Sequence, residues 1–241
     1  MNKIKLIKKI KANLIRCKIH KIFGFAENLL IFGGYMLKLS RWADKNRKIL
    51  RYNDFYNLHV RHKDREDLYQ FLLDEKKLRD KEINYLEFGV AEGNSLRWWS
   101  EHNSHSGSGF WGYDTYEGLP EKYGTYKAGK FSQGGEFPDI PDERIHFIKG
   151  LFQDTLLDTL TNIDFQKKTI VHFDADLYSS TLFSFTMLIP HMKKGDLVIF
   201  DEFSVPYHEF KAFDDITKSF YLNLEPLGAV NNYLQVIFEV K

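Results

Sequence analysis

The sequence predicts an α/β fold in which a mostly parallel sheet is flanked by helices. Short apolar runs alternate with helical or loop segments along most of the chain, and this alternation is typical of a parallel sheet with helices on its faces. A helix around Leu68 and Leu72 is expected to cover the sheet. Two runs joined by residues 228–232 predict an antiparallel hairpin at the C-terminal end. The five runs expected to form the parallel core are 83–90, 109–114, 145–150, 169–176 and 196–203.

Length and composition limit the class of protein. With 241 residues the chain is long enough for one α/β domain with an appendage. The single cysteine, Cys17, excludes an intrachain disulfide and fits a reducing compartment. No uninterrupted apolar run reaches the length that a bilayer span needs, so a cytoplasmic location is expected. The net charge is +1, and no nucleic-acid partner is expected.

Residues 1–52 are expected to form a helical extension ahead of a domain that spans residues 53–241. Within residues 1–23, Ile and Leu recur at near-helical spacing with lysines between them, which predicts a basic amphipathic helix. Such a helix suits a peripheral contact with an anionic membrane. Packing on the domain, or on a second copy in a homodimer, is the alternative. A second apolar helix is expected to break or end near Gly33–Gly34.

A glycine-containing turn follows the first core run. The stretch "YLEFGVAEGNS" places Gly89 and Gly93 between a strand and a helix that begins near Ser95, where a backbone without side chains can approach a ligand. Close packing of strand and helix explains such glycines equally well, and the GxGxxG dinucleotide fingerprint is absent. Asp114 stands at the end of the next run. In nucleotide-binding α/β folds, an acid at a comparable distance after the glycine turn holds a ribose hydroxyl. Together these features favour an adenosine-type ligand.

Two acid pairs follow neighbouring runs of the predicted sheet. The stretch "IVHFDADLYSST" places Asp174 and Asp176 after one strand, and "DLVIFDEF" places Asp201 and Glu202 after the next. A charge at a strand end requires solvent, a partner or a cation. Capping of the following helix is the structural alternative for the first pair. The second pair, one strand later, favours a cation that both pairs share.

Five motifs in order resemble a known family: "LEFGVAEGNS", "YDTYEGLPE", "GLFQDTL", "FDADLYSST" and "KKGDLVIFDEF". The chain resembles the class I S-adenosylmethionine-dependent methyltransferases from about Tyr85 to Phe203, and in particular the macrocin O-methyltransferase family, which methylates sugar hydroxyls of macrolide antibiotics. The resemblance implies a Rossmann-like fold and a sugar-containing acceptor: a polysaccharide, a nucleotide sugar or a natural-product glycoside. The cofactor pocket that it implies consists of Glu87, Gly89, Val90, Ala91, Gly93, Ser95, Asp114, Phe152, Gln153 and Asp174.

The resemblance also implies individual roles in the cofactor pocket. Ser95 would bond the methionine part of S-adenosylmethionine, and Asp114 would hold its ribose. Phe152 and Gln153 would form the wall against its adenine.

A divalent cation, usually Mg²⁺, is implied as well, with Asp174, Asp201 and Glu202 as its ligands. Mg²⁺ prefers hard oxygen ligands, which carboxylates supply. Glu202 departs from the Asp or Asn that is more usual at its position, and its longer side chain would shift the site.

The implied reaction needs a general base for the acceptor hydroxyl. Coordination to a cation would lower the pKa of the hydroxyl, and a nearby carboxylate would accept its proton. Asp174 is the first choice for this base and Asp176 the second, with His172 and His208 as alternatives.

Residues 118–142 form a long stretch without a clean period, and loops of this length often serve as lids. We expect it to close over the acceptor, with Tyr123, Tyr126 or Phe131 in contact.

The main alternative function is a DxD-type, metal-dependent glycosyltransferase, since "DAD" after a strand also matches a motif that holds a metal and a diphosphate. That interpretation leaves the glycine turn and the second acid pair without a role. An inactive scaffold anchored by the basic extension is a third interpretation, and the presence of the metal-binding acids disfavours it.

Overall fold

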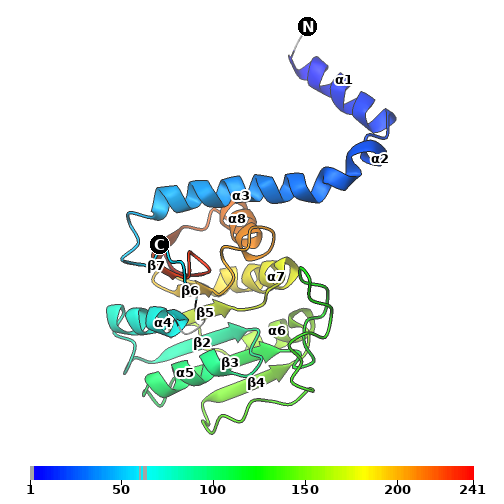
Figure 1. Cartoon of the computed structure of the whole chain (residues 1–241). Coiled ribbons are helices and arrows are strands. Elements are labelled where there is room, and N and C mark those ends of the chain that lie inside the picture. Colours follow the sequence, from blue (N-terminus) through cyan, green and yellow to red (C-terminus); the bar gives the residue numbers. More distant parts are fainter. Residues whose placement is uncertain (1–2, 60, 62–63) are drawn as a thin grey trace.

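The computed structural model describes residues 3–59, 61 and 64–241, and it contains an eight-stranded sheet with helices on both faces (Figure 1). The strand order is β1-β7-β8-β6-β5-β2-β3-β4. All neighbours are parallel except β8, which is antiparallel to both β6 and β7. The strands are β1 (Tyr52–Asn53), β2 (Ile83–Phe88), β3 (Gly109–Asp114), β4 (Ile145–Lys149), β5 (Lys168–Phe173), β6 (Leu197–Phe200), β7 (Leu224–Val230) and β8 (Gln235–Val240).

The predicted core is confirmed. Strands β2 to β6 are the five predicted parallel strands, and β7 and β8 form the predicted antiparallel hairpin. Every residue of β2 and of β6 is buried, as expected for strands covered on both faces of a parallel sheet. The short strand β1, which pairs with β7, was not predicted, because two residues carry no periodic signal.

Two hydrophobic clusters fill the space between the sheet and its helices. Helices α4 and α5 pack on one face, through Leu72 and Trp99 among others. Helices α6, α7 and α8 pack on the other face together with the second half of α3. The helices that cover the sheet are α4 (Asp64–Glu75), α5 (Asn94–His102), α6 (Phe152–Leu160), α7 (Tyr178–Leu188) and α8 (Glu209–Ser219), and a short 3₁₀ turn, η2 (Ile189–His191), follows α7.

The N-terminal extension is a chain of helices that projects from the domain (Figure 1). It consists of α1 (Lys3–Arg16), α2 (His20–Phe23), η1 (Gly24–Ala26) and α3 (Glu27–Asn46). The predicted break near Gly33–Gly34 is wrong, because α3 runs through both glycines. A glycine costs a helix only about 1 kcal/mol, and the Leu, Ile, Phe and Met residues on either side favour its continuation.

The second half of α3 is anchored on the domain. Leu39 is buried, and the ring of Trp42 lies 4.6 Å from that of Phe203. Lys38 Nζ forms an ion pair of 2.8 Å with Asp214 Oδ2 on α8. Tyr35 also packs against the core, whereas near the start of α3 the apolar side chains of Leu29 and Leu30 are each about 70% exposed.

The order of the strands determines where a ligand can bind. Strand β2 lies between β3 and β5, so the chain runs outward from β2 in both directions. At such a topological switch point, the loops beyond the carboxyl ends of the strands separate and leave a crevice. The glycine turn after β2 and the acids after β5 and β6 therefore meet at the same edge of the sheet.

Candidate active site

A cavity of about 240 Å³ lies at this edge. Its wall contains residues from the glycine turn, from both acid pairs and from the predicted lid, so segments that are far apart in the sequence share one space. The predicted site residues that line it are Gly89, Ala91, Asp114, Phe152, Gln153, Asp174, Asp176, Asp201 and Glu202.

Asp114 organises the glycine turn. Its Oδ2 accepts hydrogen bonds from the backbone N–H groups of Val90 and Ala91, at 2.8 and 2.9 Å. Its Oδ1 accepts a bond of 2.8 Å from the backbone N–H of Tyr116. The carboxylate thus fixes the shape of the turn while it remains part of the cavity wall.

Gly89 brings the turn against the first acid pair. Its φ of +93° is a conformation that residues with side chains rarely adopt. A Cβ at this position would lie 1.9 Å from the backbone oxygen of Asp174. Only glycine therefore allows the turn and the acid-bearing loop to approach this closely.

Four predicted cofactor residues do not line the cavity. The side chain of Val90 is buried in the hydrophobic cluster that α4 and α5 form with the sheet. Gly93, with a φ of +75°, faces Pro138 and begins α5. Ser95 is buried, and its Oγ lies 3.2 Å from the hydroxyl of Tyr69. Glu87 is also buried, and the hydroxyl of Tyr85 donates to its Oε2 at 3.1 Å. These residues therefore lie beneath the cavity wall, where they pack against the glycine turn and do not reach the cavity surface.

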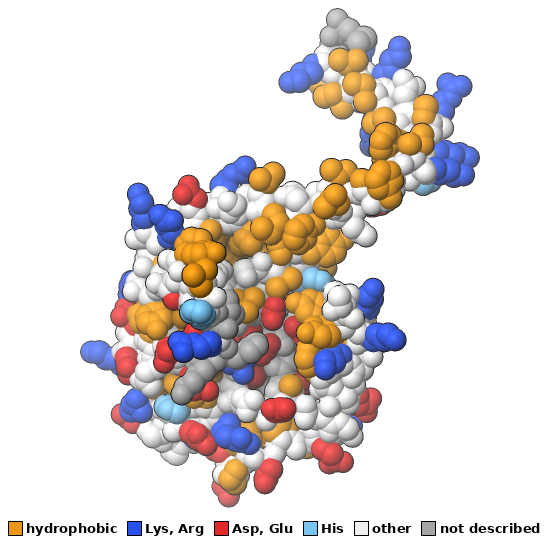
Figure 2. Space-filling model, viewed as in Figure 1, with side chains coloured by type: hydrophobic (Ala, Val, Ile, Leu, Met, Phe, Trp, Pro, Cys, Tyr) orange, Lys and Arg blue, Asp and Glu red, His pale blue; other side chains and the backbone are white. Residues whose placement is uncertain are grey.

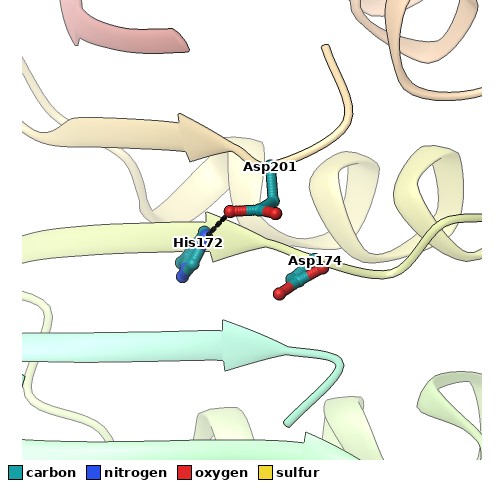
Figure 3. A group of neighbouring side chains, drawn as sticks. All are labelled: His172, Asp174 and Asp201. Carbon is teal, nitrogen blue, oxygen red and sulfur yellow. Dashed lines mark ion pairs between the residues drawn. The ribbon is translucent and has the colours of Figure 1, made fainter. Parts of the chain in front are cut away.

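The carboxylates of Asp174 and Asp201 meet at the ends of β5 and β6, together with the imidazole of His172 (Figure 3). One ligand atom from each of the three residues lies within 4.8 Å of the others. His172 is on β5, and Asp174 follows directly after the last residue of that strand. Glu202 lines the same cavity but is not part of this close group.

His172 Nε2 and Asp201 Oδ1 lie 3.6 Å apart, and both atoms are buried without a hydrogen-bond partner among the described residues. The other ring nitrogen of His172, Nδ1, lies 2.7 Å from the hydroxyl of Tyr85. Buried polar atoms are rarely left unpaired. The pair that Figure 3 marks is an ion pair only when His172 is protonated, and burial lowers the pKa of this histidine. A neutral imidazole nitrogen that faces a carboxylate oxygen suits a bound cation, whose histidine ligands are often oriented by a hydrogen bond at the other ring nitrogen.

Arg65 is a site residue that the sequence analysis missed. It stands in the first turn of α4, and its Nη1 lies 3.6 Å from Oδ2 of both Asp174 and Asp201. A cation near the N-terminus of a helix opposes the helix dipole, so an arginine there needs compensating acids. The position of this arginine at the start of a helix could have indicated from the sequence that acids lie near it. It does not show which acids these are.

The surroundings shift the pKa values of Asp174 and Asp201 in opposite directions. Burial, reinforced by the charge of Asp201, raises the pKa of Asp174 well above its usual value. Burial alone would raise the pKa of Asp201 too, but His172 and Arg65 bring it below the usual value. Burial together with Asp176 raises the pKa of Glu202 to about 7. Asp174 and Glu202 therefore bind protons more readily than ordinary carboxyl groups, whereas Asp201 stays ionised.

Asp176 differs from the other acids in its backbone. Its φ is +58°, a strained conformation that is common at functional sites. The alternative role of helix capping is not observed, because no side chain caps the N-terminus of α7 at Leu177. Burial, and then the charges of Asp201 and Asp114, raises the pKa of Asp176 to about 6.

The predicted lid contacts the acids. Gly118, Leu119, Pro120 and Phe131 line the cavity. The hydroxyl of Tyr123 donates to Glu202 Oε2 at 3.2 Å. The segment is thus a wall of the cavity, while its contact with an acceptor stays a prediction.

Two residues lie behind the acids. His208 Nδ1 accepts a bond of 3.3 Å from the backbone N–H of Tyr178, which places it at the start of α7. Glu209 is completely buried, and its Oε2 accepts a bond of 2.9 Å from the backbone N–H of Glu202. The sequence analysis did not single out Glu209, whose role is to hold the loop of the second acid pair.

Comparisons with known proteins agree with this architecture. A family model described as Macrocin-O-methyltransferase (TylF) matches residues 130–233, which include both acid pairs. A search of curated protein sequences found no match.

Similar solved structures include the calicheamicin methyltransferase CalS11, with a TM-score of 0.57 and 20% identity over 75% of this chain and 80% of that one. The O-methyltransferase NovP has a TM-score of 0.52 and 21% identity over 72% and 79%. An O-methyltransferase from Bacillus cereus has a TM-score of 0.50 and 14% identity over 91% and 96%. Residues 130–233 thus match the macrocin O-methyltransferase family model, in agreement with the motifs, and the chain has the fold of the class I methyltransferases.

Proposed function

We propose that this protein transfers the methyl group of S-adenosylmethionine to a hydroxyl of a sugar-containing acceptor, and that a divalent cation assists. The observation that carries the proposal is the single cavity in which the glycine turn at Gly89 faces the acids Asp174 and Asp201. The acids provide a negative surface for a cation and for a cationic sulfonium. The turn provides backbone against which a nucleoside can lie.

The cofactor would lie along the glycine turn. Ala91, Asp114, Phe152 and Gln153 line this part of the cavity. Asp114 would hold the ribose, and Phe152 would lie against the adenine. The Bacillus cereus enzyme is described as a complex with SAH, which agrees with a nucleoside pocket in this fold.

Asp174, Asp201 and either His172 or Glu202 would hold the cation. The donor set fits, because His172 Nε2 and Asp201 Oδ1 are buried without partners among the described residues. A set of oxygens alone favours Mg²⁺ or Mn²⁺, whereas an imidazole among the ligands favours a transition metal such as Fe²⁺ or Zn²⁺. A bound cation would lower the pKa of the acceptor hydroxyl and orient it.

We assign the general base to Asp176 ahead of Asp174. Asp174 already faces Arg65 and Asp201, so its carboxylate is engaged. Within the described part of the chain Asp176 forms no ion pair, and it lines the cavity directly. Its pKa of about 6 leaves it deprotonated at neutral pH and able to take a proton from a hydroxyl.

A nucleotide sugar is the first acceptor class to test. CalS11 is described as a TDP-rhamnose 3'-O-methyltransferase, and a glycan or a natural-product glycoside offers the same hydroxyl chemistry. The DxD glycosyltransferase alternative gains no support from the comparisons. A homodimer and a cytoplasmic location stay predictions.

The test is methyl transfer from labelled S-adenosylmethionine to a panel of nucleotide sugars and glycosides, with Mg²⁺, with Mn²⁺ and with a chelator. We expect transfer that needs the cation and that falls at least 100-fold in Asp174→Asn, in line with the loss of a metal ligand. Asp158→Asn, an exposed acid on α6, is the control. Calorimetry should show that Asp174→Asn still binds S-adenosylhomocysteine. Binding of uridine diphosphate but not of S-adenosylhomocysteine by the native protein would refute the proposal.

A further inference from the structure

The N-terminal helices carry an apolar surface that the domain does not cover. None of the residues of α1, α2 and η1 is buried. Large apolar side chains are exposed from α1 as far as Leu37 of α3 (Figure 2). They include Ile7, Ile10, Leu14, Ile22, Phe23, Phe25, Leu29, Leu30, Phe32, Met36 and Leu37. We call this set the arm surface.

Helical spacing gathers these side chains into stripes. On α3, Leu29 and Leu30 each lie seven residues, about two turns, before Met36 and Leu37, so the two pairs share one side of the helix. On α1, Ile7, Ile10 and Leu14 follow the spacing of three and four residues that marks one helical face. An uncovered apolar surface of this extent marks a site of interaction.

The charge beside the arm surface has one sign. The first acid of the chain is Glu27, and every charged residue before it is basic. The segment carries Lys3, Lys5, Lys8, Lys9, Lys11, Arg16, Lys18 and Lys21. Apolar stripes flanked by lysines are complementary to a surface that offers anionic groups above an apolar layer.

We infer that the arm surface binds an anionic phospholipid bilayer and lies along it. Residues His20–Asn46 form a helix that is long and apolar enough to cross a membrane by length and composition. Its second half, however, is packed on the domain through Leu39 and Trp42. The part of this helix that does not contact the domain contains the polar residues His20, Lys21 and Glu27. It is therefore shorter than the roughly 20 apolar residues that a membrane span requires. The arm therefore lies on the bilayer without crossing it.

A second copy of the chain is the competing occupant of the arm surface. Two arms packed together would bring two lysine-rich segments side by side, with no acid before Glu27 to offset their charge. Like charges in contact destabilise an interface. Charge complementarity thus favours the bilayer over self-association.

The test is cosedimentation of the full chain with vesicles of phosphatidylcholine alone and of phosphatidylcholine with an equal part of phosphatidylglycerol. We expect binding to the anionic vesicles that weakens as salt is added. Two variants should each lose at least about tenfold of the partition: the charge variant Lys5→Gln/Lys8→Gln/Lys9→Gln/Lys11→Gln and the apolar variant Leu29→Ser/Leu30→Ser/Leu37→Ser. Their matched controls, Lys81→Gln/Lys194→Gln and Tyr221→Ser, change exposed residues outside the arm and should bind like the native chain.

Several results would overturn the inference. One is equal binding of the native chain and both arm variants; another is no binding of the native chain to the anionic vesicles at low salt. A native dimer in sedimentation velocity that the apolar variant converts to monomer, without vesicle binding, would assign the arm surface to a second copy. Resistance of the membrane-bound chain to alkaline carbonate extraction would show a span in place of a surface helix. Unchanged melting temperatures of the variants confirm that the domain stays folded.

Discussion

Arg65 Nη1 lies 3.6 Å from Asp201 Oδ2, and it lies equally far from Oδ2 of Asp174. Its pKa is raised, because Tyr69 and the acids Asp201 and Asp174 outweigh the effect of burial, so the guanidinium keeps its charge. One helix thus supplies a positive charge to the acids at the ends of two strands. A divalent cation bound by these acids has to share them with Arg65.

Replacing Arg65 by Gln should tighten cation binding. The substitution removes a like charge beside the proposed cation site, so we expect the Kd for Mn²⁺ to fall by roughly tenfold or more. Calorimetry without cofactor measures the change directly. Arg79→Gln, at an exposed position after α4, is the control. Weaker Mn²⁺ binding in Arg65→Gln would instead mean that the arginine holds the two carboxylates in place for the cation.

Replacing Asp176 by Asn should remove the proposed general base. We expect kcat to fall by roughly 10²–10⁴-fold, the usual contribution of a positioned acid or base. In the native enzyme, kcat should fall as the pH drops through about 6, where Asp176 takes up a proton, and the variant should lack this dependence. Asp158→Asn serves again as the control. A variant that keeps its kcat would return the role of base to Asp174.

Replacing Gly89 by Ala should disrupt the cavity. The new Cβ would collide with the backbone oxygen of Asp174 at 1.9 Å, so the turn has to move. Gly124→Ala is a matched control, because Gly124 also has a positive φ, of +54°, but a Cβ there meets nothing within 4 Å. We expect Gly89→Ala to lower the free energy of unfolding by more than the ~1–2 kcal/mol of a left-handed alanine. Urea unfolding and S-adenosylhomocysteine calorimetry measure both effects, and equal behaviour of the two variants would contradict the expected collision.

Replacing Glu87 by Gln should change how stability depends on pH. Burial raises the pKa of Glu87 from 4.5 to about 8. Between these values the folded chain holds a proton that the unfolded chain has released, so the free energy of unfolding falls as the pH rises. Glutamine imitates the neutral acid and removes this loss. The melting temperature of Glu87→Gln relative to the native chain should therefore be higher at about pH 9 than at about pH 5.

The control for this prediction is Glu101→Gln, which changes an exposed acid of α5. Its melting temperature should follow that of the native chain at every pH. A constant difference between Glu87→Gln and the native chain across the same range would show that Glu87 is not held neutral in the folded state.

The sheet could be predicted because each of its core strands is marked by a short apolar run in the sequence. Runs such as "TIVHFDAD" and "DLVIFDEF" carry both the apolar strand and the acid at its end, and the rule for open parallel sheets brings those ends to one edge. Asp174 and Asp201 could therefore be placed together without a structure. Asp114 and Gly89 followed from the same rule.

Contacts that depend on the packing of whole helices could not be predicted. Arg65 reaches the acids only because α4 packs over the sheet with its first turn at the cavity, and no pattern in the sequence specifies that position. His172 was weighed only as an alternative base, because the alternation on β5 does not show that its Nε2 faces Asp201. The predicted break at Gly33–Gly34 was wrong because the local preference of glycine was given more weight than the helix formers around it.

The ring of Trp42 packs against Phe203, and it also lies 5.8 Å from Phe238 in the last strand. A recombinant fragment that begins at the predicted domain boundary, residue 53, would lack this indole and leave aromatic rings of the core facing water. Such a fragment is expected to aggregate even though it retains both acid pairs. Point substitutions in the full-length chain are for that reason a sounder way to dissect the extension than deletion of it.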